Sequence, residues 1–199
     1  MGLILYLLIA ALILVNLAGL GVAALRFFPR FPLALAAAVF GLVAAGFFVE
    51  HFFGLGHIRW LWPFTTAAAA YSIYVHRAAC QAHSADLTAY AAGFAYGFAW
   101  HYAYPDITAS SEHLPDLMFI TNYLEGVKLP PDDLWLSSQK FDYYYSLQHY
   151  AAALLGRLFG LDGGTSYNFA LCILFGFIFS LAWFSAYYFT GARKYRAGL

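Results

Sequence analysis

The sequence predicts an all-α membrane protein, a polytopic helix bundle of about five transmembrane helices with one long external loop. Charged residues make up 10% of the 199 residues and hydrophobic residues 63%, whereas a soluble domain carries about 25% charged residues. The apolar residues form continuous runs of about 20 residues, the length that a helix needs to cross a bilayer. Because these runs do not alternate with polar residues, they favour helices over a transmembrane barrel.

The apolar runs divide the chain into three regions. Four spans are predicted in residues 1–103 and a fifth follows the loop, so that the spans cover 3–25, 31–49, 60–79, 85–103 and 167–190. The first run lacks a basic n-region and is longer than a typical h-region, so we expect a retained span rather than a signal peptide. The external loop occupies 104–165 and contains two expected helices, and the returning span with its basic cytoplasmic end occupies 166–199.

Basic residues predict the orientation. Arg26, Arg30 and Arg77 are expected in the cytoplasm, because basic residues concentrate on that side of a membrane. Alternation of the spans then places the loop outside. Arg59 is an exception on the outer side, and we expect Glu50 to pair with it. The prediction is a multi-pass protein of the cell membrane with an acidic loop on its outer face.

The loop is the expected location of the chemistry. Seven of the ten acidic residues fall within 104–142, but only two of the ten basic residues do. Loops longer than about 15 residues in compact proteins are usually functional or disordered, and the aromatic residues of this loop argue against disorder. The net charge of the whole chain is zero, which argues against a nucleic-acid partner and leaves the lipid bilayer as the expected one.

The stretch 143–161 decides the topology. It is long enough to form a sixth span, which is the alternative interpretation. At about 100° per residue, however, Tyr145 and His149 share one helical face, whereas Leu147 and Leu155 lie on the opposite face. An amphipathic helix of this kind is suited to the membrane surface. A sixth span would also place the basic end of the chain outside. We therefore expect an amphipathic juxtamembrane helix.

Two acids are the first candidates for catalysis. The segment around Ser111 is typical of the first turn of a helix, and Gly126 would end that helix after Glu125. Glu112 and Asp116 lie four residues apart, hence on one face of the helix. Because two neighbouring carboxyl groups resist double ionisation, one of them can act as a base near neutral pH. Alternatively, both acids only favour the helix dipole.

A second group of candidates follows along the chain. Two aspartates after a pair of prolines would bind substrate or a divalent cation, or would cap a solvated turn. A tyrosine triplet and a histidine one turn later would bind a phosphate or a sugar hydroxyl, or would form an aromatic interface belt. These candidates are Asp132, Asp133, Tyr143, Tyr144, Tyr145 and His149. The seven histidines include no HxxxH or HExxH pair, so no histidine metal site is predicted.

Four motifs in a fixed order carry a resemblance to a known family. They are Pro-Asp-Ile from Pro105, Ser-Glu-His-Leu-Pro-Asp-Leu from Ser111, Pro-Pro-Asp-Asp-Leu-Trp from Pro130, and Phe-Asp-Tyr-Tyr-Tyr-Ser-Leu-Gln-His-Tyr from Phe141. The run from Pro105 to Asn168, about a third of the chain, resembles the YYY membrane protein family, which is named for its tyrosine triplet. That family is similar to the C-superfamily of polytopic glycosyltransferases.

The resemblance implies a substrate and roles for loop residues. The donor would be a sugar on polyprenyl phosphate. Glu112 falls where those enzymes carry their catalytic acid, and Asp116 is the nearby alternative. Lys128, Lys140 or Arg157 would stabilise the leaving phosphate. Those enzymes have many more spans after the loop, so the resemblance also implies that a missing C-terminal part of the same protein is a partner.

The leading interpretation is the amino-terminal part of a membrane glycosyltransferase-like protein. One alternative is a non-catalytic scaffold or assembly subunit whose acidic loop binds another protein. A transporter is disfavoured because the predicted spans contain few ionisable residues. In an enzyme the loop acids should converge with Tyr145 and His149, whereas in a scaffold they should point separately into solvent.

Overall fold

A computed structural model of the chain describes residues 2–107, 113–136, 138–141 and 146–190. Its helices are α1 (Leu3–Ala24), α2 (Phe31–Glu50), the short 3-10 helix η1 (Arg59–Leu61), α3 (Trp62–Val75), α4 (Arg77–Ala82), α5 (Ser84–Ala103), α6 (His113–Leu124), α7 (Ser146–Phe159) and α8 (Gly163–Phe189). The described residues form no strand, only an isolated bridge between Asp132 and Lys140. The predicted all-α helical bundle is confirmed.

Three helices, α1, α2 and α8, are long and apolar enough to cross a membrane. The predicted third span is shorter than expected, because α3 has 14 residues and the backbone leaves helical geometry at His76 and again at His83. Helix α5 has the expected 20 residues but includes Asp86 and His101, which lower its hydropathy. Helix α8 begins at Gly163, four residues before the predicted start, because the Asp162 side chain caps it by accepting from the Thr165 amide at 2.8 Å.

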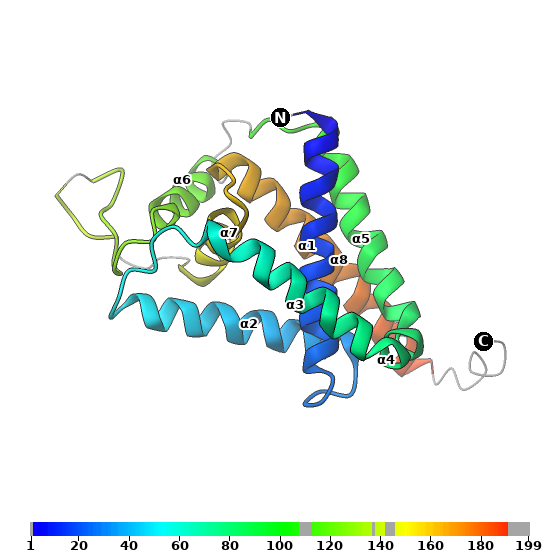
Figure 1. Cartoon of the computed structure of the whole chain (residues 1–199). Coiled ribbons are helices and arrows are strands. Elements are labelled where there is room, and N and C mark those ends of the chain that lie inside the picture. Colours follow the sequence, from blue (N-terminus) through cyan, green and yellow to red (C-terminus); the bar gives the residue numbers. More distant parts are fainter. Residues whose placement is uncertain (1, 108–112, 137, 142–145, 191–199) are drawn as a thin grey trace.

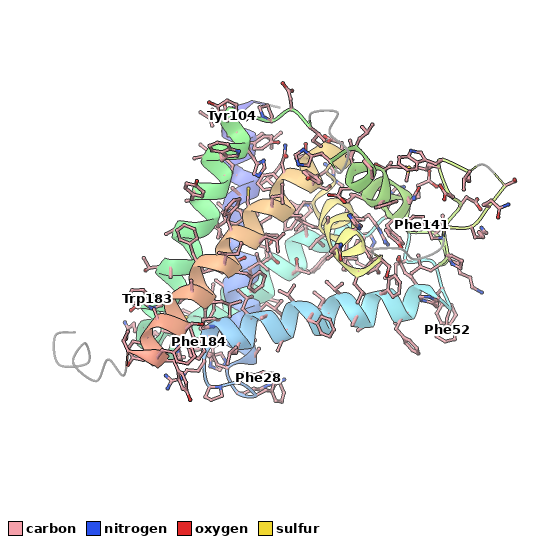
Figure 2. All side chains as sticks on the ribbon, turned by 180° about the vertical axis from the view of Figure 1, so that it is seen from behind. Phe28, Phe52, Tyr104, Phe141, Trp183 and Phe184 are labelled. Atoms are coloured by element: carbon pink, nitrogen blue, oxygen red, sulfur yellow. The ribbon has the colours of Figure 1, made fainter. Side chains whose placement is uncertain are left out.

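The long helices form one bundle, and α2 leaves this bundle at one end (Figure 1). Helices α1, α5 and α8 lie together, α3 crosses α1, and α2 diverges from the lower end of α1 toward α6 and α7 (Figure 1). Seen from behind, Phe52 after α2 and Phe141 in the loop lie on the side of the molecule away from Trp183 of α8 (Figure 2). Helices α6 and α7 therefore form a separate layer between the ends of α2 and α8.

Small residues allow close contact between the long helices. A Cβ atom on Gly93 of α5 would collide with the carbonyl oxygen of Phe175 in α8, and one on Gly97 would lie 3.0 Å from Cα of Cys172. Glycines spaced four residues apart bring membrane helices close enough for dense van der Waals packing. Between α1 and α3, the Asn16 amide donates to the Thr66 hydroxyl at 2.8 Å, a polar contact of the kind that joins helices in lipid.

Aromatic rings form the core of the α6–α7 layer. Tyr150 of α7 packs edge-to-face on Tyr123 of α6 and on Phe47 of α2, with ring centroids 5.7 and 5.2 Å apart. Phe141 packs edge-to-face on Tyr123 at 5.6 Å. Such edge-to-face pairs are the preferred geometry of aromatic rings. This core fixes α6 and α7 against the end of α2.

Helix α7 differs from its prediction in which face is buried. The expected polar face, with His149, was predicted to meet water at the membrane surface. Instead His149 and Arg157 are both buried, because α7 packs against α6, α8 and α2. His149, on the predicted polar face, therefore lies in the interior of the protein. The two polar side chains are buried because each has an ionic partner on another element.

Candidate functional site

Helices α6 and α7 lie parallel and in register. Near their N-terminal ends, Asp116 contacts His149, 33 residues later. Near their C-terminal ends, a Cβ atom on Gly156 would lie 3.0 Å from Leu124, 32 residues earlier. Asp116 lies in the first turn of α6, as predicted, where a carboxylate favours the helix dipole. The parallel arrangement brings residues of two separate motifs to the same end of the layer.

The central contact is between Asp116 and His149. The distance from His149 Nε2 to Asp116 Oδ1 is 2.9 Å. The imidazole is buried and packs edge-to-face on the Phe119 ring at 5.1 Å, whereas the side chain of Asp116 is 35% exposed. The histidine is thus fixed on the protein side, and the carboxylate remains reachable from outside. This is the arrangement expected of an oriented acid–base pair.

Helix α8 and the segment before α6 complete the surroundings of this pair. The Asn168 side-chain amide of α8 donates to the carbonyl oxygen of Pro105 at 3.1 Å. The ring of Tyr167, the residue before Asn168, lies 6.3 Å from the ring of His113 in α6. The motifs that contain Asp116 and His149 are therefore in direct contact, and the motif that contains Pro105 is attached to α8.

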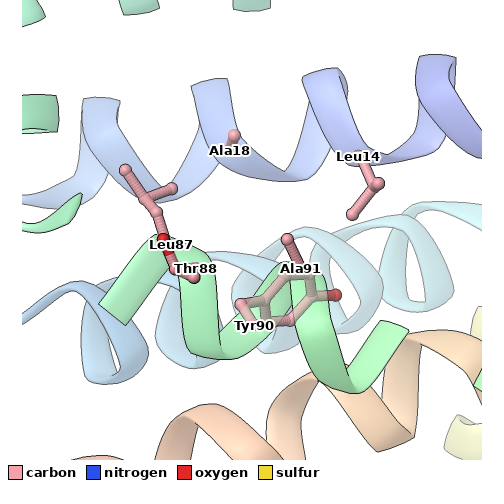
Figure 3. A pocket seen from close by; sticks show the side chains of 6 residues that line it. All are labelled: Leu14, Ala18, Leu87, Thr88, Tyr90 and Ala91. Atoms are coloured by element: carbon pink, nitrogen blue, oxygen red, sulfur yellow. The ribbon is translucent and has the colours of Figure 1, made fainter. Parts of the chain in front are cut away.

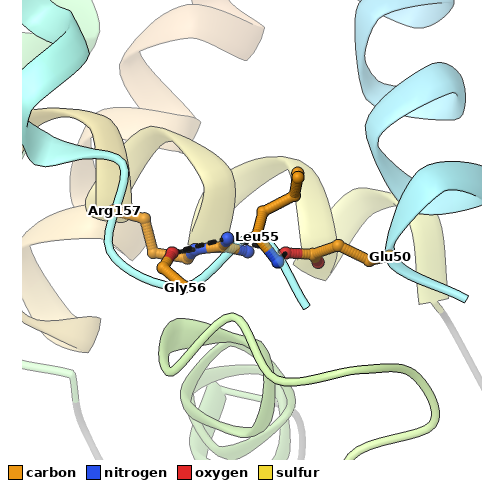
Figure 4. A network of polar contacts seen from close by, with 4 residues as sticks. All are labelled: Glu50, Leu55, Gly56 and Arg157. Atoms are coloured by element: carbon orange, nitrogen blue, oxygen red, sulfur yellow. Dashed lines mark hydrogen bonds and ion pairs between the residues drawn. The ribbon is translucent and has the colours of Figure 1, made fainter. Parts of the chain in front are cut away.

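A second ion pair lies at the other end of the layer. The distance from Arg157 Nη2 to Glu50 Oε1 is 2.6 Å, and both side chains are 1% exposed (Figure 4). Nε and Nη2 of Arg157 also donate to the Gly56 carbonyl at 3.1 and 2.8 Å. The Leu55 amide donates to Glu50 Oε1 at 3.2 Å. The expected pairing of Glu50 with Arg59 is wrong, because Arg157 occupies the carboxylate.

This buried pair joins four segments of the chain. The Leu129 amide donates to the Glu50 carbonyl at 2.9 Å, and the Gly56 amide donates to the Gly126 carbonyl at 2.8 Å. Gly126 ends α6 with φ of 66°, and a Cβ atom there would collide with the Arg157 guanidinium. Burial, together with the nearby Glu50 carboxylate, raises the pKa of the Tyr150 hydroxyl well above its ordinary value, so this hydroxyl stays protonated.

The other predicted site residues do not join Asp116 and His149. The Lys140 ammonium pairs with Asp132 at 2.6 Å on the exposed surface of the loop. Asp133 accepts from two backbone amides of its own loop. Glu112 and the triplet Tyr143, Tyr144 and Tyr145 lie outside the residues that the structure describes. Among the described residues that the sequence predicted, the structure thus brings together two separate pairs, Asp116 with His149 and Asp132 with Lys140.

Two cavities lie outside this pair. One, of about 290 Å³, lies between α1 and α5 and is lined by apolar side chains with the hydroxyls of Thr88 and Tyr90 (Figure 3). The other, of about 420 Å³, lies at the C-terminal ends of α6 and α7 beside His57, Arg59 and Glu125. Within the described ranges, no three acidic, histidine or cysteine side chains group closely enough to bind a metal ion.

Fold and site together define a helical membrane protein with a small polar layer set against its long apolar helices. The chain belongs to a family described as uncharacterized membrane protein (DUF2298), whose sequence model matches residues 53–199. The matched region includes both Asp116 and His149. Searches of curated proteins and of solved structures found no match.

Proposed function

We propose that this chain is the amino-terminal part of a glycosyltransferase-like membrane protein that uses a polyprenyl-phosphate sugar on the outer face of a multi-pass membrane domain. The observation that carries the proposal is the 2.9 Å contact between Asp116 and His149. It joins the acidic motif and the tyrosine-triplet motif, the two segments on which the resemblance to those enzymes mainly rests. An acid that only favoured the helix dipole would need no such partner.

In the proposed reaction, Asp116 is the base. With the proton of the imidazole on Nε2, His149 donates to the carboxylate and fixes its orientation. The carboxylate takes the proton of the acceptor hydroxyl, and the acceptor oxygen attacks the anomeric carbon of the donor sugar. The bond from that carbon to the phosphate oxygen breaks, and its electron pair leaves with the polyprenyl phosphate. Glu112, four residues before Asp116, is the alternative base.

The leaving phosphate needs a cation that stabilises its negative charge. The resemblance implied Lys128, Lys140 or Arg157 for this role, and two of them already have ionic partners. Arg157 is buried against Glu50, and Lys140 pairs with Asp132. Lys128 is exposed and, among the described residues, makes no ion pair. Its backbone, however, lies beside Gly54, at the end of the α6–α7 layer away from Asp116, so the proposal assigns the phosphate contact to none of these three cations.

The test is Asp116→Asn. With the protein in lipid nanodiscs and a short-chain polyprenyl-phosphate hexose as the donor, the variant should transfer hexose to water or to added glycans at least about 100-fold more slowly, the usual contribution of a general base. The matched control is Glu125→Gln, which neutralises an exposed acid just after α6 and should leave the rate unchanged.

The scaffold alternative makes the opposite prediction. Its support is that the Asp132 side chain is exposed and pairs with Lys140 rather than with Asp116 or His149. If Asp116→Asn transfers hexose at the rate of Glu125→Gln, or if neither variant nor the unchanged protein transfers any, the acid–base assignment fails. The chain would then be better described as a binding module.

A further inference from the structure

Three consecutive large apolar side chains are exposed at the tip of the external loop. Leu134, Trp135 and Leu136 are 58%, 60% and 62% exposed. Single exposed apolar residues need no explanation, but contiguous exposed apolar surface marks an interaction site. The tip also lies in the region that the sequence predicted to be aqueous and acidic. This apolar surface needs a partner.

The backbone amide groups of the tip already have hydrogen-bond acceptors within the protein. The Leu134 amide donates to the Asn122 side chain at 3.3 Å, and the Trp135 and Leu136 amides donate to Asp133 Oδ1 at 2.7 and 3.2 Å. Peptide groups that enter a membrane need internal hydrogen-bond partners, because little water is present there to supply them. All three tip residues meet this requirement for their amide groups.

The two carboxylates beside the tip also have partners. The Asp133 carboxylate is occupied by the tip amides, and the neighbouring Asp132 pairs with Lys140 at 2.6 Å. An ion pair of this kind reduces the cost of bringing either charge close to a medium of low dielectric constant. The two carboxylates beside the tip thus have hydrogen-bonding partners, which lowers the cost of placing them near the lipid interface.

The base of the loop is attached to the end of a candidate span. Leu129 donates its amide to the carbonyl of Glu50, the last residue of α2. Around this end, the rings of Phe48, Phe52 and Phe53 are exposed and in contact with one another. Figure 2 shows the outward position of Phe52 on this side of the molecule. The loop thus starts beside exposed aromatic rings at the end of a helix that is long and apolar enough to cross a membrane.

We propose that the loop tip, Leu134–Leu136, is a membrane-contact element that inserts its side chains into the lipid interface beside the end of α2. Tryptophan with neighbouring leucines is the composition preferred at that depth. Trp135 packs on Phe119, and Phe119 packs on His149, with centroids 6.3 and 5.1 Å apart. The tip would therefore hold the Asp116–His149 pair at the membrane surface. The inference does not depend on the transfer reaction.

The experiment measures fluorescence quenching of Trp135 in lipid vesicles. In one variant Trp135 is the single tryptophan, and in a second Trp100 of α5, an exposed residue on a long helix, is the single one; phenylalanine replaces the others. Phosphatidylcholine brominated near the glycerol end of its chains should quench Trp135 to at least about half the extent seen for Trp100. Aqueous iodide should quench Trp135 much less than free tryptophan.

A further variant keeps Trp135 and changes its neighbours. Leu134→Ser with Leu136→Ser should raise iodide quenching of Trp135 about threefold, because both apolar anchors are lost. Leu114→Ser, which changes an exposed leucine outside the tip, should have no effect on it. Full iodide quenching without bromolipid quenching would show that the tip lies in water and would overturn the proposal. Protection from both quenchers would show that protein covers the tip, and would equally overturn it.

Discussion

Replacing Arg157 with methionine is expected to lower the free energy of unfolding by about 3–5 kcal/mol. The change leaves the Glu50 carboxylate, which is 1% exposed, without its cation in the interior. It also removes the two hydrogen bonds to the Gly56 carbonyl. A buried charge that loses its partner keeps the full cost of desolvation. Unfolding in detergent, followed by circular dichroism against denaturant, measures the change.

Two further variants separate the charge effect from lost packing. Adding Glu50→Gln to Arg157→Met removes the orphaned charge, so the double variant should recover a large part of the loss. Breaking the exposed pair with Lys140→Met should cost less than about 1 kcal/mol, because both of its side chains are largely in water. An Arg157→Met protein as stable as the Lys140→Met protein would contradict the structural role assigned to the buried pair.

The long helices could be predicted because hydropathy alone determines a span. The first two were predicted as 3–25 and 31–49, and α1 and α2 end within one residue of those limits. The third was predicted too long. Its interruption at His76 has no proline or glycine signal in the sequence, so the apolar residues on both sides of this break were joined into one span.

The candidate residues could be selected from the sequence, but their contacts with one another could not. Asp116 and His149 were each chosen from local pattern, but their contact across 33 residues depends on α6 and α7 lying parallel. Glu50 was assigned to Arg59, the nearer basic residue, although its partner is Arg157, 107 positions later. Helical periodicity distinguishes polar from apolar faces, but it does not identify the ionic partner of a residue such as His149 or Arg157.

Replacing Gly93 with leucine should destabilise the contact between α5 and α8 by about 3 kcal/mol or more, at the upper end of overpacking effects. The first atom of the new side chain would already collide with the Phe175 carbonyl oxygen, and beyond it lies the Phe179 side chain. The colliding oxygen belongs to a helix backbone, so it cannot move away as a side chain would. Separation of the two helices would also expose the buried residues Phe94 and Cys172.

A matched glycine provides the control for this prediction. Gly41 lies in the middle of α2, and a Cβ atom there meets nothing within 4 Å. Gly41→Leu adds the same side chain to a long apolar helix, but into open space, so it should leave the unfolding transition unchanged or raise it slightly through better helix propensity. Thermal unfolding of the two variants in the same detergent makes the comparison. Equal transition temperatures for Gly93→Leu and Gly41→Leu would mean that α5 and α8 are not packed through their glycines, and the arrangement that supports the α6–α7 layer would have to be revised.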